Sequence, residues 1–165
     1  MIDRNELVKW LRSIDNKLHR KITLIAVGGT AMTLLGLKSS TRDIDFCIKS
    51  EEKKDFEKVL DKKFKVDIFT DGYIFSEQLP ADYSEKSKEI IRMKNIDLKA
   101  LDPIDIIITK AARFNARDEE DIEALSKYVD KDELVKRFND VVNSYSGKED
   151  EYSYHMKIIL KRFFQ

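Results

Sequence analysis

Hydrophobic residues along this chain fall into short apolar runs in the first part and into helix-like spacing in the second. Runs of four to six residues at 22–27, 43–48, 64–69, 90–93 and 96–101 are rich in Ile, Val, Leu and Phe. Runs of this length bounded by polar residues predict strands. The last two are separated by Lys94-Asn95 and are expected to pair as a hairpin.

The remaining early segments have the pattern of helices and turns. Asp3 with Glu6 has the spacing of a capping box and predicts a helix whose apolar side chains share one face, namely Leu7, Leu11, Ile14 and Leu18. A short helix is expected at 30–37, and Ser50 is expected to cap another that ends near residue 60. Asp71-Gly72 predicts a turn, and 73–88 is interpreted as loop with a short helix.

The last third of the chain is expected to be helical. Asp102-Pro103 places a capping residue before a proline of the first turn. Three or four helices should follow to Gln165, interrupted at 115–117, near Asp130 and at Gly147. The fold class predicted is α+β, with a small mixed β-sheet flanked by helices and a helical C-terminal part. We expect one domain over 1–165, with its core at about 22–101 and its helical part at about 102–165.

Composition narrows the class of protein. The 165 residues are 42% hydrophobic and 38% charged, and Lys plus Arg equals Asp plus Glu, so no overall basic field advertises nucleic-acid binding. A single cysteine excludes an intrachain disulfide and is typical of a reducing cytoplasm. No apolar run approaches the roughly 20 residues of a membrane span. We therefore expect a cytoplasmic protein without membrane contact.

The chemistry is expected at a glycine turn and an acidic strand. Gly28-Gly29-Thr30 closes the first predicted strand, and Asp43-Ile44-Asp45 opens the second after a twelve-residue spacer. Because a strand has a period of two, Asp43 and Asp45 should point to one face. Carboxylates acting with substrate phosphates are the usual way in which proteins hold Mg²⁺, and a helix that starts after glycines attracts phosphate. The pattern therefore indicates chemistry on a nucleoside triphosphate.

Asp67 provides a third carboxylate inside a predicted strand, in the sequence Val66-Asp67-Ile68-Phe69. If the second and third strands are neighbours, Asp67 joins Asp43 and Asp45, and such a cluster needs a cation to relieve its repulsion. The alternative is that Asp67 ends an edge strand and faces water.

These motifs together resemble the nucleotidyltransferase-fold superfamily, and most closely its minimal and abortive-infection (AbiEii-like) branch. The resemblance covers about residues 22–125. It rests on Gly28-Gly29-Thr30, Thr41-Arg42-Asp43-Ile44-Asp45 and Asp67, together with a downstream block from 101 to 122 that contains Lys110 and Arg117-Asp118.

The resemblance implies a role for each matched residue. Asp43, Asp45 and Asp67 would be the catalytic and metal-binding residues, with Mg²⁺ or Mn²⁺ as the cofactor, and Asp67 would act as, or assist, the base for the acceptor hydroxyl. Nucleotide binding would fall to the remaining matched positions, Gly28, Gly29, Thr30, Arg42 and Lys110. The accessory positions would be Arg117, Asp118 and Asp121.

The activity implied is transfer of a nucleoside monophosphate from a nucleoside triphosphate to a hydroxyl of RNA, tRNA included, or of protein. A toxin–antitoxin or phage-defence setting, a toxin or antitoxin partner and a homodimer that completes the cleft belong to the same expectation. The alternative is a non-catalytic module of this fold that binds a nucleotide or a protein partner.

Some of these residues have simpler interpretations. Lys110 lies on a predicted helix where a solvated lysine is common, and Arg117 and Asp121 have the i,i+4 spacing of a surface ion pair. A dinucleotide site is disfavoured because Gly28-Gly29 lacks the GxGxxG spacing.

Overall fold

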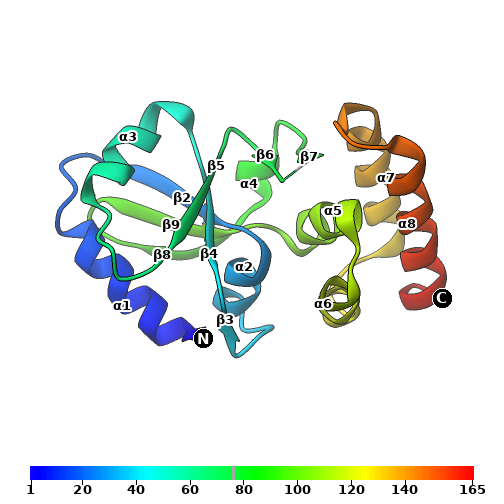
Figure 1. Ribbon diagram of the computed structural model, residues 1–165, viewed down its shortest axis with the longest axis horizontal. Coiled ribbons are helices and arrows are strands. Elements are labelled where there is room, and N and C mark those ends of the chain that lie inside the picture. Colours follow the sequence, from blue (N-terminus) through cyan, green and yellow to red (C-terminus); the bar gives the residue numbers. More distant parts are fainter. Residues whose placement is uncertain (76) are drawn as a thin grey trace. The chain divides into compact units, whose positions relative to one another are not determined.

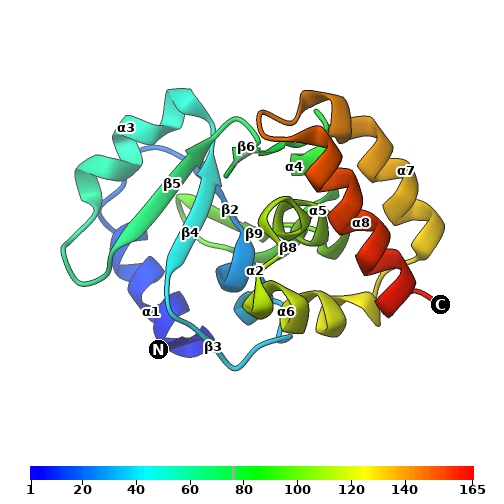
Figure 2. The same cartoon turned by 45° about the vertical axis from the view of Figure 1, so that its right-hand side comes forward.

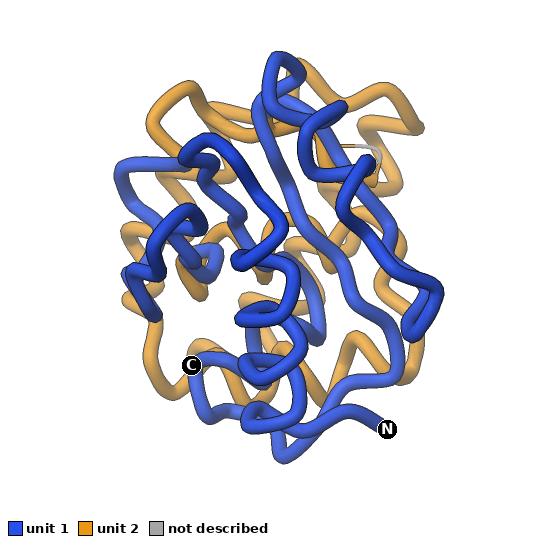
Figure 3. The backbone as a smooth tube through the Cα atoms, turned by 90° about the vertical axis from the view of Figure 1, so that its left-hand side faces the viewer, with its two compact units in different colours: residues 1–71, 84–101 blue, residues 72–83, 102–165 orange. Residues whose placement is uncertain are grey.

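The structure of the protein is a computed structural model, and it describes residues 1–75 and 77–165. The chain divides into two compact units. Unit 1 consists of Met1–Asp71 and Ser84–Leu101, and unit 2 consists of Gly72–Tyr83 and Asp102–Gln165 (Figure 3). The last division falls at the Leu101–Asp102 junction, where the sequence predicts that the helical part begins.

Unit 1 is built on a mixed sheet with the strand order β5-β4-β2-β9-β8 (Figure 1). Its strands are β2 (Ile22–Ala26), β4 (Ile44–Ile48), β5 (Val66–Thr70), β8 (Lys88–Arg92) and β9 (Ile96–Ala100). Strand β2 is parallel to β9 and antiparallel to β4, β4 is parallel to β5, and β8 is antiparallel to β9. The expected hairpin around Lys94-Asn95 is therefore present, although β8 begins two residues earlier than predicted.

One face of this sheet forms the core of unit 1. Its inward-pointing side chains are almost inaccessible to solvent and follow the period of two that strands require: Ile22, Leu24, Ala26, Ile44, Phe46 and Ile48. The ring of Phe46 meets Phe56 of helix α3 (Ser50–Val59) edge to face at 6.0 Å between centroids. Helix α1 (Arg4–Asp15) lies on the same side of the sheet as α3 (Figure 1).

Local capping explains where the first helices begin. The Asp3 side chain accepts a hydrogen bond from the Glu6 backbone N–H at 2.8 Å, which confirms the predicted start of α1. The predicted cap at Ser50 is wrong. Ser50 is the first residue of α3, and Lys49 precedes it without a side-chain cap.

Helix α2 (Gly28–Leu34) starts two residues before the predicted Thr30 because both glycines already belong to it. The sequence did not predict a two-residue ladder between β1 (Ile2–Asp3) and β3 (Ser40–Thr41). Asp71-Gly72 forms the predicted turn, with φ values of +53° and +81°.

Unit 2 is mostly helical. Helix α5 (Pro103–Arg113) contacts the three helices that surround it (Figure 2), which are α6 (Ala116–Ser126), α7 (Lys131–Val141) and α8 (Glu149–Phe163). A single 3₁₀ turn, η1 (Val142–Ser144), precedes α8. Asp102, Asn115 and Asp130 cap α5, α6 and α7 through their side chains, so the predicted helix boundaries are confirmed.

The segment interpreted as loop with a short helix contains that helix, α4 (Tyr83–Lys86), and a hairpin that was not predicted. The hairpin joins β6 (Tyr73–Ile74) to β7 (Glu77–Gln78) and belongs to unit 2. The observed class is α+β, as predicted. In the described part of the chain, no helix combines the length and apolar character that crossing a membrane requires.

Candidate active site

Asp45 and Asp67 stand side by side on neighbouring strands. Strand β4 pairs in parallel with β5, and Asp45 is the register partner of Asp67. Register partners on adjacent strands point to the same face, about 4.8 Å apart along the hydrogen-bonding direction. The condition under which Asp67 could join the acidic strand is therefore met. We refer to Asp45 and Asp67 as the acidic pair.

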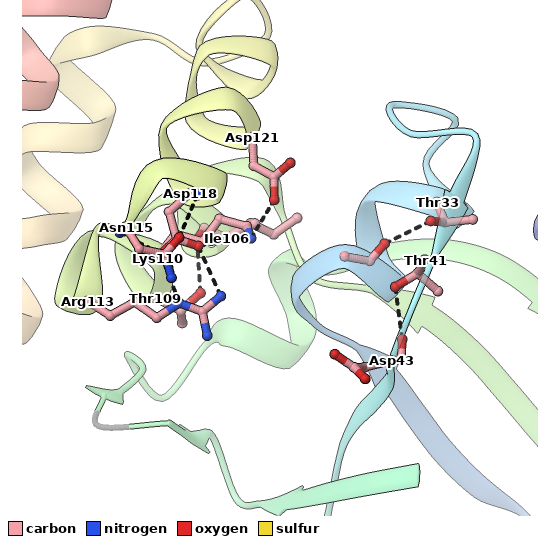
Figure 4. A network of polar contacts seen from close by, with 11 residues as sticks. Thr33, Thr41, Asp43, Ile106, Thr109, Lys110, Arg113, Asn115, Asp118 and Asp121 are labelled. Atoms are coloured by element: carbon pink, nitrogen blue, oxygen red, sulfur yellow. Dashed lines mark hydrogen bonds and ion pairs between the residues drawn. The ribbon is translucent and has the colours of Figure 1, made fainter. Parts of the chain in front are cut away.

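Asp43 lies one residue before β4, and a small hydrogen-bond network fixes its backbone, of which Figure 4 shows the bond from Thr41. Its carbonyl oxygen accepts hydrogen bonds from the hydroxyls of Thr30 at 3.0 Å and Thr41 at 2.9 Å. The Thr30 hydroxyl in turn accepts a hydrogen bond from the Asp45 backbone N–H at 3.0 Å. Thr30 thus ties helix α2 to both ends of the Asp43-Ile44-Asp45 segment.

This network gives Thr30 a structural role, while its expected contact with a phosphate stays a prediction. The residue is fully buried, and its hydroxyl both donates and accepts within the protein. A hydroxyl has one proton to donate, so the phosphate contact implied by the resemblance would break the bond to Asp43. In this structure Thr30 positions the acidic segment.

The glycine turn lies directly against the acidic pair. Gly28 has a φ of +55°, a conformation that residues with side chains rarely adopt, and a Cβ there would lie 3.6 Å from Oδ2 of Asp45. At Gly29 a Cβ would lie 3.0 Å from the Thr41 hydroxyl. Both positions therefore favour glycine, Gly28 for its conformation and Gly29 for the close approach of Thr41.

The donor set suits a magnesium ion that a substrate helps to hold. Mg²⁺ in phosphate-transfer sites takes one or two carboxylates and completes its shell with water and substrate phosphates. The acidic pair, with Asp43 nearby, has that composition. Within residues 1–75 and 77–165, no three His, Cys, Asp or Glu side chains are arranged to hold a metal by themselves.

Arg42 and Asp43 are exposed. Arg42 has no ion-pair partner in the described part of the chain. It remains a candidate for nucleotide binding by prediction only.

Lys110 belongs to a buried ion-pair cluster in unit 2 (Figure 4). Its ammonium group donates to Asp121 at 2.8 Å and lies 3.6 Å from Asp118, while Arg113 holds Asp118 with two hydrogen bonds of 2.8 and 3.0 Å. Only 6% of the Lys110 side chain is exposed, so the interpretation as a solvated lysine is wrong. Whether Lys110 also contacts a nucleotide stays a prediction.

The same cluster sets the charge of Asp118. Burial acts to raise the pKa of Asp118, but the hydrogen bonds from Arg113 and the Asn115 backbone, with the charge of Lys110, outweigh it, and the pKa lies below its ordinary value. Asp118 is therefore held as an anion, and it accepts hydrogen bonds from Arg113 and the Asn115 backbone N–H at the junction of α5 and α6.

The surface ion pair expected between Arg117 and Asp121 is not observed. Asp121 is buried and bonds Lys110 of the preceding helix, whereas Arg117 is exposed. The i,i+4 spacing was misleading because the turn between α5 and α6 brings a buried lysine closer than the exposed arginine.

Two further buried carboxylates of unit 2 were not anticipated. Asp105 is fully buried and receives two hydrogen bonds from Arg137, at 2.7 and 2.9 Å. Glu77 is also fully buried, and its Oε2 lies 2.8 Å from the Tyr152 hydroxyl. The signal available in the sequence was an acidic residue in an otherwise apolar stretch, Ile104-Asp105-Ile106 for the first of them.

Comparisons with known proteins agree with the class that the mixed sheet, the glycine turn and the acidic pair indicate. The family model described as "Nucleotidyltransferase of unknown function (DUF6036)" matches residues 5–164, so the chain belongs to this family. The predicted superfamily is confirmed at this level, while the abortive-infection branch stays a prediction.

Among solved structures, the chain is similar to a presumed nucleotidyltransferase from Thermotoga maritima. The two share 18% sequence identity with a TM-score of 0.47, over 78% of this chain and 94% of the other. Comparison with curated proteins gave no match.

Proposed function

We propose that this protein is a Mg²⁺-dependent nucleotidyltransferase that moves a nucleoside monophosphate from a nucleoside triphosphate to a hydroxyl of RNA or protein. The observation that carries the proposal is the register of Asp45 with Asp67, next to a glycine whose missing side chain leaves room beside the Asp45 carboxylate. Two aligned carboxylates repel each other unless a cation lies between them, and a triphosphate brings that cation. Family membership supports the same reaction class.

Asp43, Asp45 and Asp67 would hold the metal. Bound there with the triphosphate, Mg²⁺ would neutralise phosphate charge and lower the pKa of the attacking hydroxyl. The Thr30 hydroxyl keeps Asp43 and Asp45 in place through the backbone. Phosphoryl-type transfer depends chiefly on such positioning and charge neutralisation.

The reaction balances without a further co-reactant. The acceptor oxygen attacks the α-phosphorus and forms a new P–O bond, while the bond from that phosphorus to the bridging oxygen of the β-phosphate breaks and pyrophosphate leaves. The acceptor proton passes to a base, for which Asp67, exposed and beside Asp45, is the candidate. Gly28 and Gly29 would line the triphosphate, with Arg42 and Lys110 as candidate phosphate contacts and Arg117, Asp118 and Asp121 as accessory positions.

Thermal denaturation with and without Mg²⁺ and a nucleoside triphosphate tests the site before an acceptor is known. A ligand that binds only the folded state stabilises it by about 2.7 kcal/mol at a hundred times its Kd, so the melting temperature should rise. Asp43→Ala with Asp45→Ala should abolish that rise and leave the melting temperature without ligand nearly unchanged. A double mutant that still responds fully would overturn the assignment.

The alternative function is a non-catalytic module that binds a nucleotide or a protein partner. It predicts the same stabilisation but no transfer of label from a triphosphate. A toxin–antitoxin setting and the abortive-infection branch are proposals of the same kind, and co-purification of a partner from the native host would test them.

A further inference from the structure

The zero net charge of the chain conceals two oppositely charged units. Unit 1 contains 20 lysines and arginines against 15 aspartates and glutamates, a formal charge of +5. Unit 2 contains 11 against 16, a formal charge of −5. The positive unit is the one that contains the acidic pair, so its excess of basic residues exists in spite of that acidic site.

Some of these basic residues line a cavity of about 360 Å³ in unit 1. The lining includes Lys21 and Thr23 at the start of β2, Arg92 at the end of β8, and Lys94 in the turn that leads to β9. Strand β2 runs from this cavity towards Gly28, so the cavity lies at the end of the sheet opposite the acidic pair. Thr23, the lining residue of β2 nearest to that end, lies four residues from Val27, which is opposite Asp45, and this is about 13 Å at the usual rise of a strand.

Two cations of the cavity are not neutralised by the protein. Lys21 and Lys94 are exposed, and neither has a hydrogen-bond or ion-pair partner within residues 1–75 and 77–165. Arg92 is different, because Glu89 accepts its Nε–H at 2.9 Å.

The lining also contains two carboxylates, Glu52 and Asp97. Oε1 of Glu52 accepts the Thr23 backbone N–H at 3.1 Å. Burial, followed by a hydrogen bond and charge repulsion from Glu89, raises the pKa of Asp97, and its Oδ1 lies 3.9 Å from Nε of Arg92. These acids lie nearest to Arg20 and Arg92, at 4.0 and 3.9 Å, so among the described residues Lys21 and Lys94 are the cations of the lining without an ion-pair partner.

We propose that Lys21 and Lys94 at this cavity bind the phosphate backbone of a single-stranded RNA, which makes RNA the acceptor class of the proposed transferase. The role of RNA as acceptor rests on the proposed function, whereas the binding of RNA at this cavity does not. Phosphates at regular intervals suit separate, unpaired lysines, and release of counterions makes each such contact favourable at low salt.

The exposed surface of unit 1 favours RNA over a protein acceptor. Large exposed hydrophobic side chains in the described part of the chain are Met1, Tyr73, Phe75, Tyr128 and Tyr154, and only Met1 belongs to unit 1. Protein interfaces are anchored by aromatic and apolar residues at their centre. A basic cavity on a surface poor in such residues is typical of polyanion binding.

Fluorescence anisotropy of a short labelled single-stranded RNA with the full chain tests the proposal without any triphosphate. Lys21→Glu with Lys94→Glu should weaken binding about tenfold or more at low salt and lower the slope of log K against log salt by about 1.4. Lys58→Glu with Lys62→Glu is the matched control, because both are exposed lysines of unit 1 outside the cavity lining and the charge change is the same. That control should lose clearly less affinity.

Equal losses of RNA affinity in the two double variants, or no RNA binding by the wild type, would overturn the assignment of this cavity as an RNA-binding surface. The proposal would also be overturned if Lys21→Glu with Lys94→Glu bound RNA normally but no longer transferred label to a protein band. That result would mean that the cavity serves a protein acceptor. Failure of the surface stays separate from failure of the transferase, because Asp43→Ala with Asp45→Ala should still bind RNA while losing the triphosphate-dependent rise in melting temperature.

Discussion

The buried carboxylates of unit 2 and the exposed carboxylates of the candidate site in unit 1 differ in what surrounds them. In unit 2 each buried acid has a partner within about hydrogen-bond distance: Asp105 has Arg137, Asp118 has Arg113, Asp121 has Lys110 and Glu77 has Tyr152. In unit 1, Asp43 and Asp67 are exposed and have no ion-pair partner among the described residues, and Asp67 lies beside another carboxylate.

This difference separates acids that stabilise the fold from acids that await a ligand. A buried carboxylate is tolerated only if a cation or hydrogen-bond donor is built in. Adjacent carboxylates at the surface cost little in water, and a cation supplied from outside can bind between them. Substitutions in unit 2 should therefore reduce stability, whereas substitutions at the acidic pair should reduce function alone.

The largest effect on stability is expected from Arg137→Ala. It leaves the fully buried Asp105 without the guanidinium that holds both of its oxygens, and breaking a buried pair from one side costs about 3–5 kcal/mol. Urea denaturation measures the free energy of unfolding. Arg162→Ala, which removes an exposed arginine paired with Glu119, is the control and should cost at most about 1 kcal/mol. Similar losses for the two variants would remove the contrast between buried and exposed pairs.

Glu77 should make the stability depend on pH. Burial raises its pKa from 4.5 to about 7, against a smaller opposing effect of the Tyr152 hydrogen bond. The folded state therefore binds the Glu77 proton more tightly than the unfolded state. The contribution of this proton to the free energy of unfolding is complete below about pH 4.5 and is lost as the pH rises to about 7. The loss amounts to about 3 kcal/mol.

Geometry supports a protonated Glu77. Tyr152 has one hydroxyl proton but contacts both Glu77 at 2.8 Å and the Ile108 carbonyl at 3.1 Å. If Glu77 donates to Tyr152, Tyr152 can donate to Ile108, and both contacts are satisfied. Glu77→Gln should remove the corresponding fall in unfolding free energy between pH 5 and 8. An unchanged pH profile in this variant would contradict the assignment.

A smaller effect, on both stability and binding, is expected at the glycine turn. Gly28→Ala forces a side chain into a φ of +55° and should cost about 1 kcal/mol. Gly36→Ala is a matched control, since Gly36 has a φ of +77° but a Cβ added there would meet no atom within 4 Å. Both should destabilise alike, and only Gly28→Ala should weaken triphosphate-dependent stabilisation, because its Cβ approaches Asp45. If triphosphate stabilised both variants equally, the glycine turn at Gly28 would not be part of the triphosphate site.

The smallest effect on stability is expected from Asp43→Asn with Asp67→Asn. Exposed substitutions usually change the free energy of unfolding by no more than about 0.5 kcal/mol, and removing like charges acts in the stabilising direction. Urea denaturation should find the variant as stable as the wild type. A loss above about 1 kcal/mol would mean that these carboxylates hold the fold together, as those of unit 2 do.

Local patterns in the sequence predicted most of the elements. Asp3, Asp102, Asn115 and Asp130 mark helix starts through chemistry that lies within three residues of each cap, so a sequence reader can see it. Two-residue strands such as β1 and β3 lack a pattern of that kind. They form because the partner is present, which only the fold determines.

The candidate site was predictable in its residues and less so in its contacts. The motif located Asp45 and Asp67, but the sequence did not determine the order of strands in the sheet. Only the structure shows that the strands of these two residues are neighbours. The burial of Lys110 and the role of Thr30 were missed because both follow from tertiary hydrogen bonds. Charge patterning over whole units was also hidden, since the totals cancel.

The central claim is tested most directly by transfer of label from α-³²P nucleoside triphosphates, with Mg²⁺ or Mn²⁺, to total RNA and to a cell lysate. We predict labelled RNA with wild-type protein, release of pyrophosphate in step with it, and neither product with Asp43→Ala plus Asp45→Ala. Label that persists in the double mutant, or no transfer to RNA or protein with any of the four nucleotides, would contradict a transferase centred on the acidic pair.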